Sequence, residues 1–173
     1  MTGARPHPPA PGFEEFFLRY EPVVRRYLFA RSARNDVLDE AAQATMEAAL
    51  RSWTRLATHP NPQAWLFKVA AQRHATAYKE HLRLGERTDP ADFDRLPPDA
   101  AGITCDDRLE MMHKISELPE QQREALILRW LFDLPYDQVA HVMGVRASSA
   151  RAHVSRALSR LTQMYTEEEG GCT

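Results

Sequence analysis

The sequence predicts an all-α protein of two small helical domains joined by a flexible linker. Apolar residues recur at helical spacing from about Phe13 to Arg83, and again from Arg108 to about Tyr165. Between them, residues 85–107 carry three prolines, two glycines and many aspartates without any periodicity, which is typical of a linker. No alternating run indicates a strand. We therefore expect a tail over 1–12, a domain over 13–84, a linker over 85–107, a domain over 108–165 and an acidic tail over 166–173.

Three helical segments are expected in the first domain. Residues 13–31 form one or two helices, and residues 36–53 form a second long helix with Asp36 as N-cap and acids in its early turns, where the helix dipole favours them. The sequence THPNP ends that helix, and a further helix runs from Gln63 to about Arg83. The expected core of residues 13–31 consists of Phe16, Phe17, Tyr20, Val24, Tyr27 and Leu28.

The second domain has the sequence form of a helix-turn-helix. A helix starts at Pro119, and a short helix follows in YDQVAHVM, with Tyr136, Val139, Ala140 and Met143 on one face. Gly144 suits the left-handed residue that ends a helix. From Ser149 a basic helix presents arginines and serines outward, without any acid before Leu161. Its expected buried face consists of Ala150, Val154, Ala157, Leu158 and Leu161. An ordinary packing helix of a bundle is the alternative.

Composition and charge narrow the function. The chain has 173 residues, 43% of them hydrophobic and 27% charged, and no apolar run long enough to cross a bilayer. Its Pro-rich N-terminus lacks the apolar centre of a signal peptide, and Cys105 and Cys172 form no CxxC pair. We therefore expect a reduced, cytoplasmic protein without membrane insertion. The net charge of −2 argues against tight unaided binding to DNA.

An enzyme is a poor fit to these residues. The chain has seven histidines, but no HExxH motif, Gly-rich phosphate loop, nucleophile–base pair or carboxylate-rich cluster. We expect no catalytic residue, no metal site and no cofactor.

Three segments together resemble a known family. LPEQQREALILRWLFDLPYDQVAHVMGVRASSARAHVSRALSRL (118–161) is similar to the DNA-binding domain of bacterial RNA polymerase sigma factors, of the extracytoplasmic-function (ECF) type. NPQAWLFKVAAQR (61–73) resembles the promoter-melting segment of that group, and DEAAQATMEAAL (39–50) resembles its polymerase-binding helix. The resemblance covers about Phe13 to Tyr165, and matches in the right order are more specific than a lone helix-turn-helix.

The resemblance implies a role for each segment. Core RNA polymerase would contact Asp39, Glu40 and Gln43, although the two acids also suit the helix dipole. Of the aromatic residues after the loop, Trp65 is expected in the core rather than stacked on a base. The −10 promoter element would be melted and read by His59, Asn61, Gln63, Lys68, Gln72, Arg73 and Lys79, and the −35 element by Ser148, Ser149, Arg151, His153, Ser155, Arg156 and Arg160.

The expected partners are core RNA polymerase, promoter DNA and an anti-sigma factor that would clamp between the two domains. The competing interpretation is a helix-turn-helix regulator that does not engage core polymerase. That interpretation accounts for the second domain but leaves the NPQAWLFKVA segment unexplained.

Overall fold

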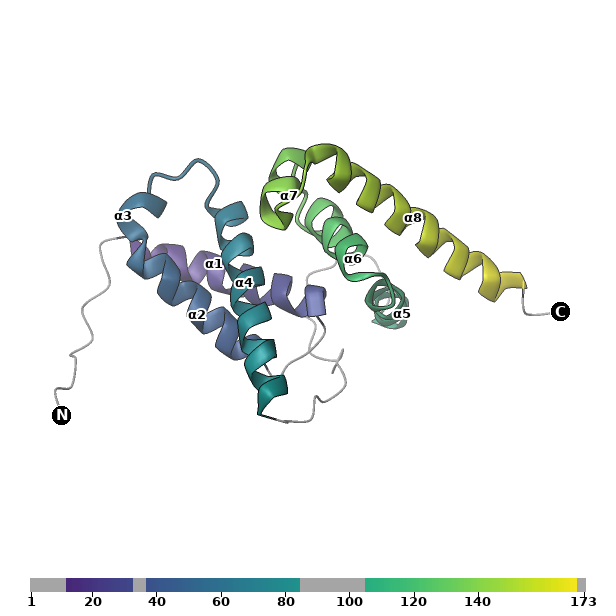
Figure 1. The fold of residues 1–173 in the computed structure, drawn as a ribbon, viewed down its shortest axis with the longest axis horizontal. Coiled ribbons are helices and arrows are strands. Elements are labelled where there is room, and N and C mark those ends of the chain that lie inside the picture. Colours follow the sequence, from purple (N-terminus) through teal and green to yellow (C-terminus); the bar gives the residue numbers. More distant parts are fainter. Residues whose placement is uncertain (1–11, 33–36, 85–104, 171–173) are drawn as a thin grey trace.

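The computed structural model describes residues 12–32, 37–84 and 105–170, and these residues form helices and connecting turns without strands. The N-terminal half contains α1 (Phe13–Ser32), α2 (Leu38–Arg51), α3 (Trp53–Leu56) and α4 (Pro62–Arg83). The C-terminal half contains α5 (Cys105–Ser116), α6 (Glu120–Leu126), the π-helix η2 (Ile127–Leu131), α7 (Tyr136–Met143) and α8 (Ala147–Gly170) (Figure 1). The predicted all-α class is confirmed.

Helices α1, α2 and α4 pack around the core of the N-terminal half. Val24, Leu28 and Leu66 are completely buried there. The expectation for Phe17 is wrong, since its side chain is 38% exposed, while Phe16 and Tyr20 are half-buried beside Trp53. Helix α1 is continuous through an exposed Pro22, so residues 13–31 form one helix and not two.

The second helix is shorter than the sequence predicts. Helix α2 starts at Leu38, and the preceding Val37 makes no side-chain capping bond. The predicted cap, Asp36, lies outside the described residues. Helix α2 ends at Arg51 and the separate short helix α3 follows, so the segment before THPNP is divided in two.

In the C-terminal half, α8 packs on α6 and α7 through the predicted stripe, with Ala150, Val154 and Ala157 buried. Leu158 departs from the prediction and is 39% exposed. The cause is helical geometry: the stripe is centred between Val154 and Ala157, so Leu158 lies at its edge. Helix α8 starts two residues before Ser149 and continues past Tyr165 to Gly170.

Several predictions fall partly or wholly outside the described residues. The tail over 1–11, the linker over 85–104 and Cys172 lie outside the described residues. Residues 105–107 are the first turn of α5 and therefore helical.

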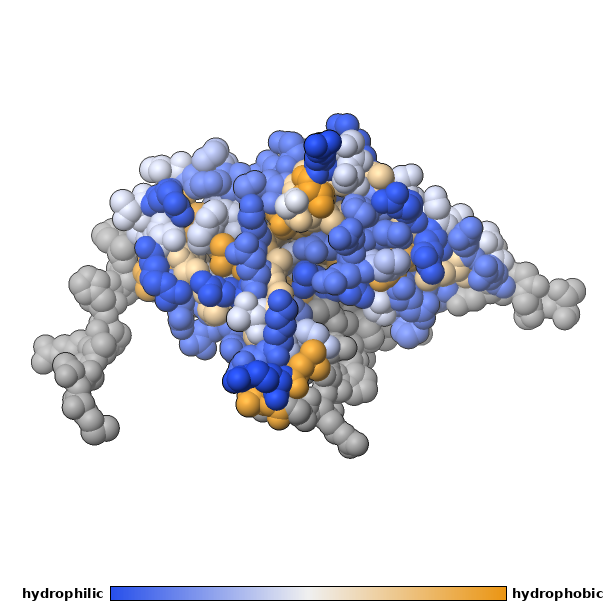
Figure 2. Space-filling model, in the orientation of Figure 1, coloured by the Kyte–Doolittle hydropathy of each residue, from blue (hydrophilic) through white to orange (hydrophobic). Residues whose placement is uncertain are grey.

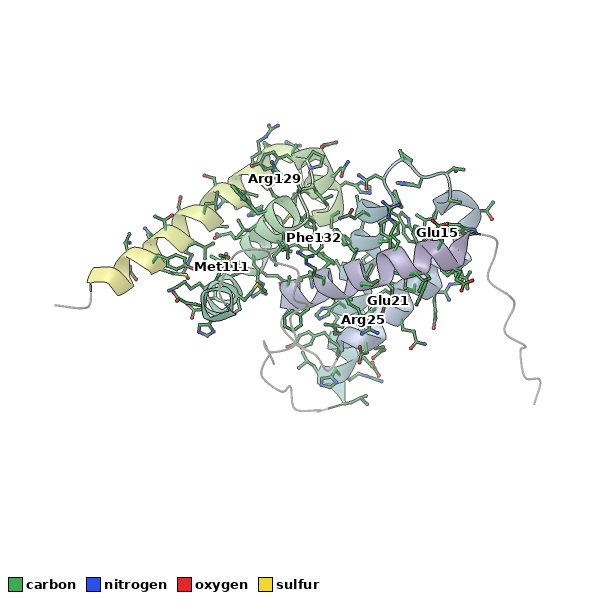
Figure 3. The ribbon with its side chains drawn as sticks, turned by 180° about the vertical axis from the view of Figure 1, so that it is seen from behind. Glu15, Glu21, Arg25, Met111, Arg129 and Phe132 are labelled. Carbon is green, nitrogen blue, oxygen red and sulfur yellow. The ribbon has the colours of Figure 1, made fainter. Side chains whose placement is uncertain are left out.

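The two halves lie directly against each other (Figure 1). Helix α7 packs on α4, and η2 and α5 pack on α1. Buried residues of both halves form one continuous cluster, and Phe132, just after η2, contacts the rings of Tyr27 and Phe67. Figure 3 shows Phe132 at this junction.

Candidate nucleic-acid interface

Helices α7 and α8 form a helix-turn-helix with the predicted turn. Gly144 ends α7 with φ +69°, and a Cβ built there would meet nothing within 4 Å. Glycine is therefore required by the left-handed backbone and not by crowding. The Val145 N–H donates to the Ala140 carbonyl over 3.0 Å, which closes the turn before α8 starts.

The predicted −35 residues line the outer side of α8. Arg151, Ser155, Arg156 and Arg160 are exposed together with Ser148, whereas Ser149 and His153 are half-buried. No acidic residue occurs between Val145 and Thr166. We call the exposed and half-buried residues of α8 from Ser148 to Arg160 the α8 basic face. Figure 2 shows that the visible side of this helix is mainly hydrophilic.

The Tyr136 ring, which is outside the predicted set, lies against Arg151 and also against Arg129. The Arg151 guanidinium lies 5.2 Å from the Tyr136 ring centroid, and the Arg129 guanidinium lies 5.6 Å from the same centroid. Arg129 is held in turn by Asp133, whose Oδ1 accepts from Nη1 over 2.6 Å, and this hydrogen bond is the main cause of the raised pKa of Arg129. The sequence did not indicate these contacts, because spacing within one helix does not show that Tyr136 of α7 meets residues of α8 and η2.

The loop before α4 is built by two predicted −10 residues. The Asn61 side-chain Oδ1 accepts from the Ala64 N–H over 3.0 Å and so caps α4 at Pro62. The Asn61 N–H donates to Nδ1 of His59, also over 3.0 Å. Both residues therefore have structural roles in this loop, and Gln63 beside them is half-buried.

The predicted −10 residues on α4 differ in how far their side chains are exposed. Gln72, Arg73 and Lys79 are exposed, and Lys68 is half-buried. The ring that is completely buried is that of Phe67, which stacks on Tyr27, whereas Trp65 is half-buried against the core. The expectation that Trp65 lies in the core is therefore met only in part, because its side chain is half-buried.

The three predicted polymerase contacts are exposed on the first turns of α2. Asp39 accepts from Arg25, which also pairs with Glu21 on α1, and these two hydrogen bonds raise the pKa of Arg25 (Figure 3). Gln43 donates to Glu47 over 3.0 Å. The structure thus holds the three sets of predicted residues on separate surfaces: α8, the start and outer side of α4, and the start of α2.

Within residues 12–32, 37–84 and 105–170, no group of three or more His, Cys, Asp or Glu side chains is arranged to hold a metal ion. Over the same residues, no helix has the length and apolar character needed to cross a membrane.

Comparisons with known proteins match both halves. The family model for sigma-70 region 2 matches residues 16–83, and the model for sigma-70 region 4 matches residues 108–161. RNA polymerase sigma factor CarQ of Myxococcus xanthus is 27% identical over 161 residues, covering 91% of each chain. The ECF RNA polymerase sigma factor SigD of Mycobacterium tuberculosis is 30% identical over 153 residues, covering 81% of this chain and 70% of SigD.

The fold is similar to that of a solved sigma factor. RpoE of Bartonella quintana, crystallised in complex with the anti-sigma factor NepR, matches with a TM-score of 0.74 and 21% identity over 91% of this chain and 98% of RpoE.

Proposed function

The chain belongs to the sigma-70 family of RNA polymerase sigma factors, in its ECF group, and we propose that it directs core polymerase to promoters through the three surfaces described above. The observation that carries this proposal is the helix-turn-helix with the α8 basic face, in a chain that also carries a matching region 2.

The α8 basic face is assigned to the −35 element. A recognition helix enters the major groove by its N-terminal end, where Ser148 and Arg151 are exposed. Arginine can bind guanine through two hydrogen bonds, and serine can bind either a base edge or a phosphate. Arg156 and Arg160 lie further along the helix, where phosphate contacts would fix its orientation.

The loop from His59 to Gln63 and the outer side of α4 are assigned to the −10 element. The exposed side chains of Gln72, Arg73 and Lys79 supply hydrogen-bond donors and positive charge along this helix. Unpaired bases can bind in pockets or stack on exposed side chains, while cations hold the backbone. Because Asn61 already caps α4, its available side-chain donor is the amide nitrogen.

Asp39, Glu40 and Gln43 on α2 are assigned to core polymerase. They are exposed, they lie within two turns of one helix, and they are separate from both DNA-binding surfaces. We further assign the protein to the cytoplasm, where polymerase and promoters are found, and assign it no catalytic reaction of its own. An anti-sigma partner also remains part of the proposal, and titration of an anti-sigma candidate into the sigma–core complex would test it by release of core.

Run-off transcription tests the proposal directly. Core polymerase is incubated with fragmented genomic DNA from the source organism, with and without the purified protein. Discrete transcripts that depend on the protein are expected, and their start sites would reveal both promoter elements. Absence of transcripts together with absence of co-elution with core on gel filtration would support a helix-turn-helix regulator instead.

A further inference from the structure

The closed arrangement of the two halves is incompatible with binding both promoter elements at once. Elements centred near −10 and −35 lie about 25 base pairs apart, which is about 85 Å along B-DNA at 3.4 Å per base pair. In the structure, α7 packs directly on α4, so the two DNA-binding domains are in contact. If the proposed function holds, the halves must separate before promoter binding.

The junction between the halves has an aromatic part. The Phe132 ring centroid lies 4.7 Å from that of Phe67 and 6.0 Å from that of Tyr27, at steep interplanar angles of 65° and 75°. Tyr27 and Phe67 are themselves stacked at 4.4 Å within the N-terminal half. Phe132 of the C-terminal half thus packs against the buried Tyr27–Phe67 pair of the N-terminal half.

Beside these rings lies a polar group of four side chains that joins α1 to α6. The Tyr27 hydroxyl donates to Glu124 Oε1 over 2.7 Å in a buried hydrogen bond. Arg31 Nη2 donates to Glu120 Oε1 over 3.0 Å, and Arg31 Nε lies 3.3 Å from Glu124 Oε1, near enough for an ion pair but without hydrogen-bond geometry. The Arg31 and Glu124 side chains are only 11% and 10% exposed.

The burial of these groups makes the junction specific. Burial raises the pKa of Tyr27 well above its ordinary value, and the charge of Glu124 raises it further, so the hydroxyl stays a donor. Burial is the largest single influence on the pKa of Arg31 and would lower it, but the interactions with Glu124, Tyr27 and Glu120 together outweigh burial, so the pKa is raised. Removing one partner of such a pair leaves the other charge buried and uncompensated.

We propose that Tyr27, Arg31, Glu120 and Glu124 form an interdomain latch that holds the free protein closed, and that opening this latch is a required step before promoter engagement. The existence of the latch does not depend on the proposed function. Only its expected effect on transcription rests on that function. Each latch residue has its partner in the opposite half, so separation exposes polar groups that water can solvate. An entirely apolar junction would instead expose a large hydrophobic surface on opening, and such a surface favours aggregation.

A cavity lies beside the Arg31–Glu120 part of the latch. It has a volume of about 320 Å³ and is lined by Arg31 and Glu120 together with His74, Tyr78, Lys79 and Arg123. Glu120 is 68% exposed at this opening, whereas Glu124 is buried. The latch therefore depends mainly on Glu124, and Glu120 contributes less because water screens its charge.

The test measures the distance between the halves in the full-length protein. Spin labels are attached at Thr54→Cys and Ser159→Cys, both exposed, in a chain whose Cys105 and Cys172 are replaced by serine. Double electron–electron resonance on the wild-type latch should give one narrow distance distribution. Glu124→Gln should raise the population at longer distances at least about tenfold, Tyr27→Phe and Glu120→Gln less, and the matched control Glu80→Gln, an exposed pair with Arg83 inside α4, not at all.

Three outcomes would overturn the latch. These are a broad distribution in the wild type, an unchanged distribution in both Glu124→Gln and Tyr27→Phe, or an equal effect of Glu80→Gln. Circular dichroism identifies an unfolded variant, and Tyr27→Phe, which keeps the ring, then decides the question.

Variants with an opened latch should also produce transcripts faster when the protein is limiting. An unchanged rate would refute the proposal that opening is a required step before promoter engagement. Absence of transcripts from wild type would instead contradict the proposed function, while the distance measurement would still test the latch.

Discussion

The geometry around Arg151 suits the recognition role proposed for this side chain. It is exposed on the first turns of α8, and its guanidinium is held over the Tyr136 ring at 5.2 Å. Stacking on an aromatic ring restricts the orientation of the guanidinium while its edge stays available for hydrogen bonds. Less conformational entropy is then lost when the fork binds a guanine or a phosphate.

Replacing Arg151 should therefore weaken promoter recognition without affecting polymerase binding. We expect Arg151→Ala to lower transcription from the promoter about tenfold or more, as the loss of a bidentate contact of about 1–3 kcal/mol implies. Run-off transcription measures the effect, and gel filtration with core polymerase should show an unchanged complex. Arg19→Ala, which removes an exposed arginine above the Tyr20 ring on α1, is the control. Loss of the polymerase complex in Arg151→Ala would contradict the −35 assignment.

Asp133 has a left-handed backbone conformation that most residues other than glycine adopt only at a cost. Of the described residues other than glycine, it is the one with positive φ, at 50°, and it lies between η2 and α7. Aspartate tolerates this region better than most side chains, whereas β-branched residues do so poorly.

We expect Asp133→Val to lower the free energy of unfolding by about 1–2 kcal/mol, because the left-handed region is costly for a β-branched residue. Asp133→Gly should be neutral or stabilising, since the Arg129 pair that it removes is exposed and of small value. Thermal unfolding monitored by circular dichroism compares the two variants. Equal melting temperatures would show that the backbone at this position is not strained.

At the scale of elements, the loop before α4 combines a structural role with a proposed functional one. Asn61 caps the helix that carries the predicted −10 contacts, and His59 accepts from the Asn61 backbone. A loss of melting activity in an Asn61 variant could therefore come from the helix end or from the lost amide.

Two substitutions separate these roles. Asn61→Ala should destabilise the protein by about 1 kcal/mol because the Ala64 N–H loses its acceptor, and should reduce open-complex formation. Asn61→Asp keeps the acceptor and should retain wild-type stability, so any loss of open complex in this variant reports on the amide nitrogen. Permanganate footprinting of the −10 region measures opening, and thermal unfolding measures stability. Full opening by Asn61→Asp would remove Asn61 from the base-reading set.

Helix periodicity and turn chemistry predicted most of the elements, because these are local properties. The buried stripe of Ala150, Val154 and Ala157 and the left-handed Gly144 follow from spacing and from backbone sterics alone. The π-helix η2 and the break between α2 and α3 have no comparable local signal. The candidate sites were placed by resemblance, and the structure adds which members are exposed and which are engaged in local hydrogen bonds.

Contacts between the halves were beyond prediction for a different physical reason. The bond between Tyr27 and Glu124 joins residues 97 positions apart, and nothing in either local pattern indicates its partner. A sequence with two periodic regions and a Pro-rich stretch between them is equally compatible with separate and with packed domains. The sequence therefore predicted a linker, whereas the contacts between the two halves are known only from the structure.

For the whole molecule, charge and surface separation together explain how a protein of net charge −2 can act at promoters. The α8 basic face carries arginines without any acid, but the chain as a whole is slightly acidic, so each DNA contact alone is expected to be weak. Attachment of both domains to one polymerase raises their effective concentration at the two elements. The proposed polymerase-binding surface on α2 is therefore expected to be as important for promoter use as the proposed DNA-binding surfaces.

The last prediction therefore concerns assembly. Asp39→Lys combined with Glu40→Lys should abolish the complex with core polymerase and, with it, all promoter-dependent transcription. The fold should persist, because both side chains are exposed, the reversal at the helix N-terminus costs only about 0.3–1 kcal/mol per charge, and the Arg25–Asp39 pair that is lost is exposed and of small value. Glu14→Lys with Glu15→Lys is the matched control, since it reverses two exposed acids in the first turn of α1. Gel filtration with core polymerase distinguishes the pairs. If the α2 variant still co-eluted with core while the α1 variant did not, the polymerase-binding surface would lie on α1, and the role assigned to α2 would be wrong.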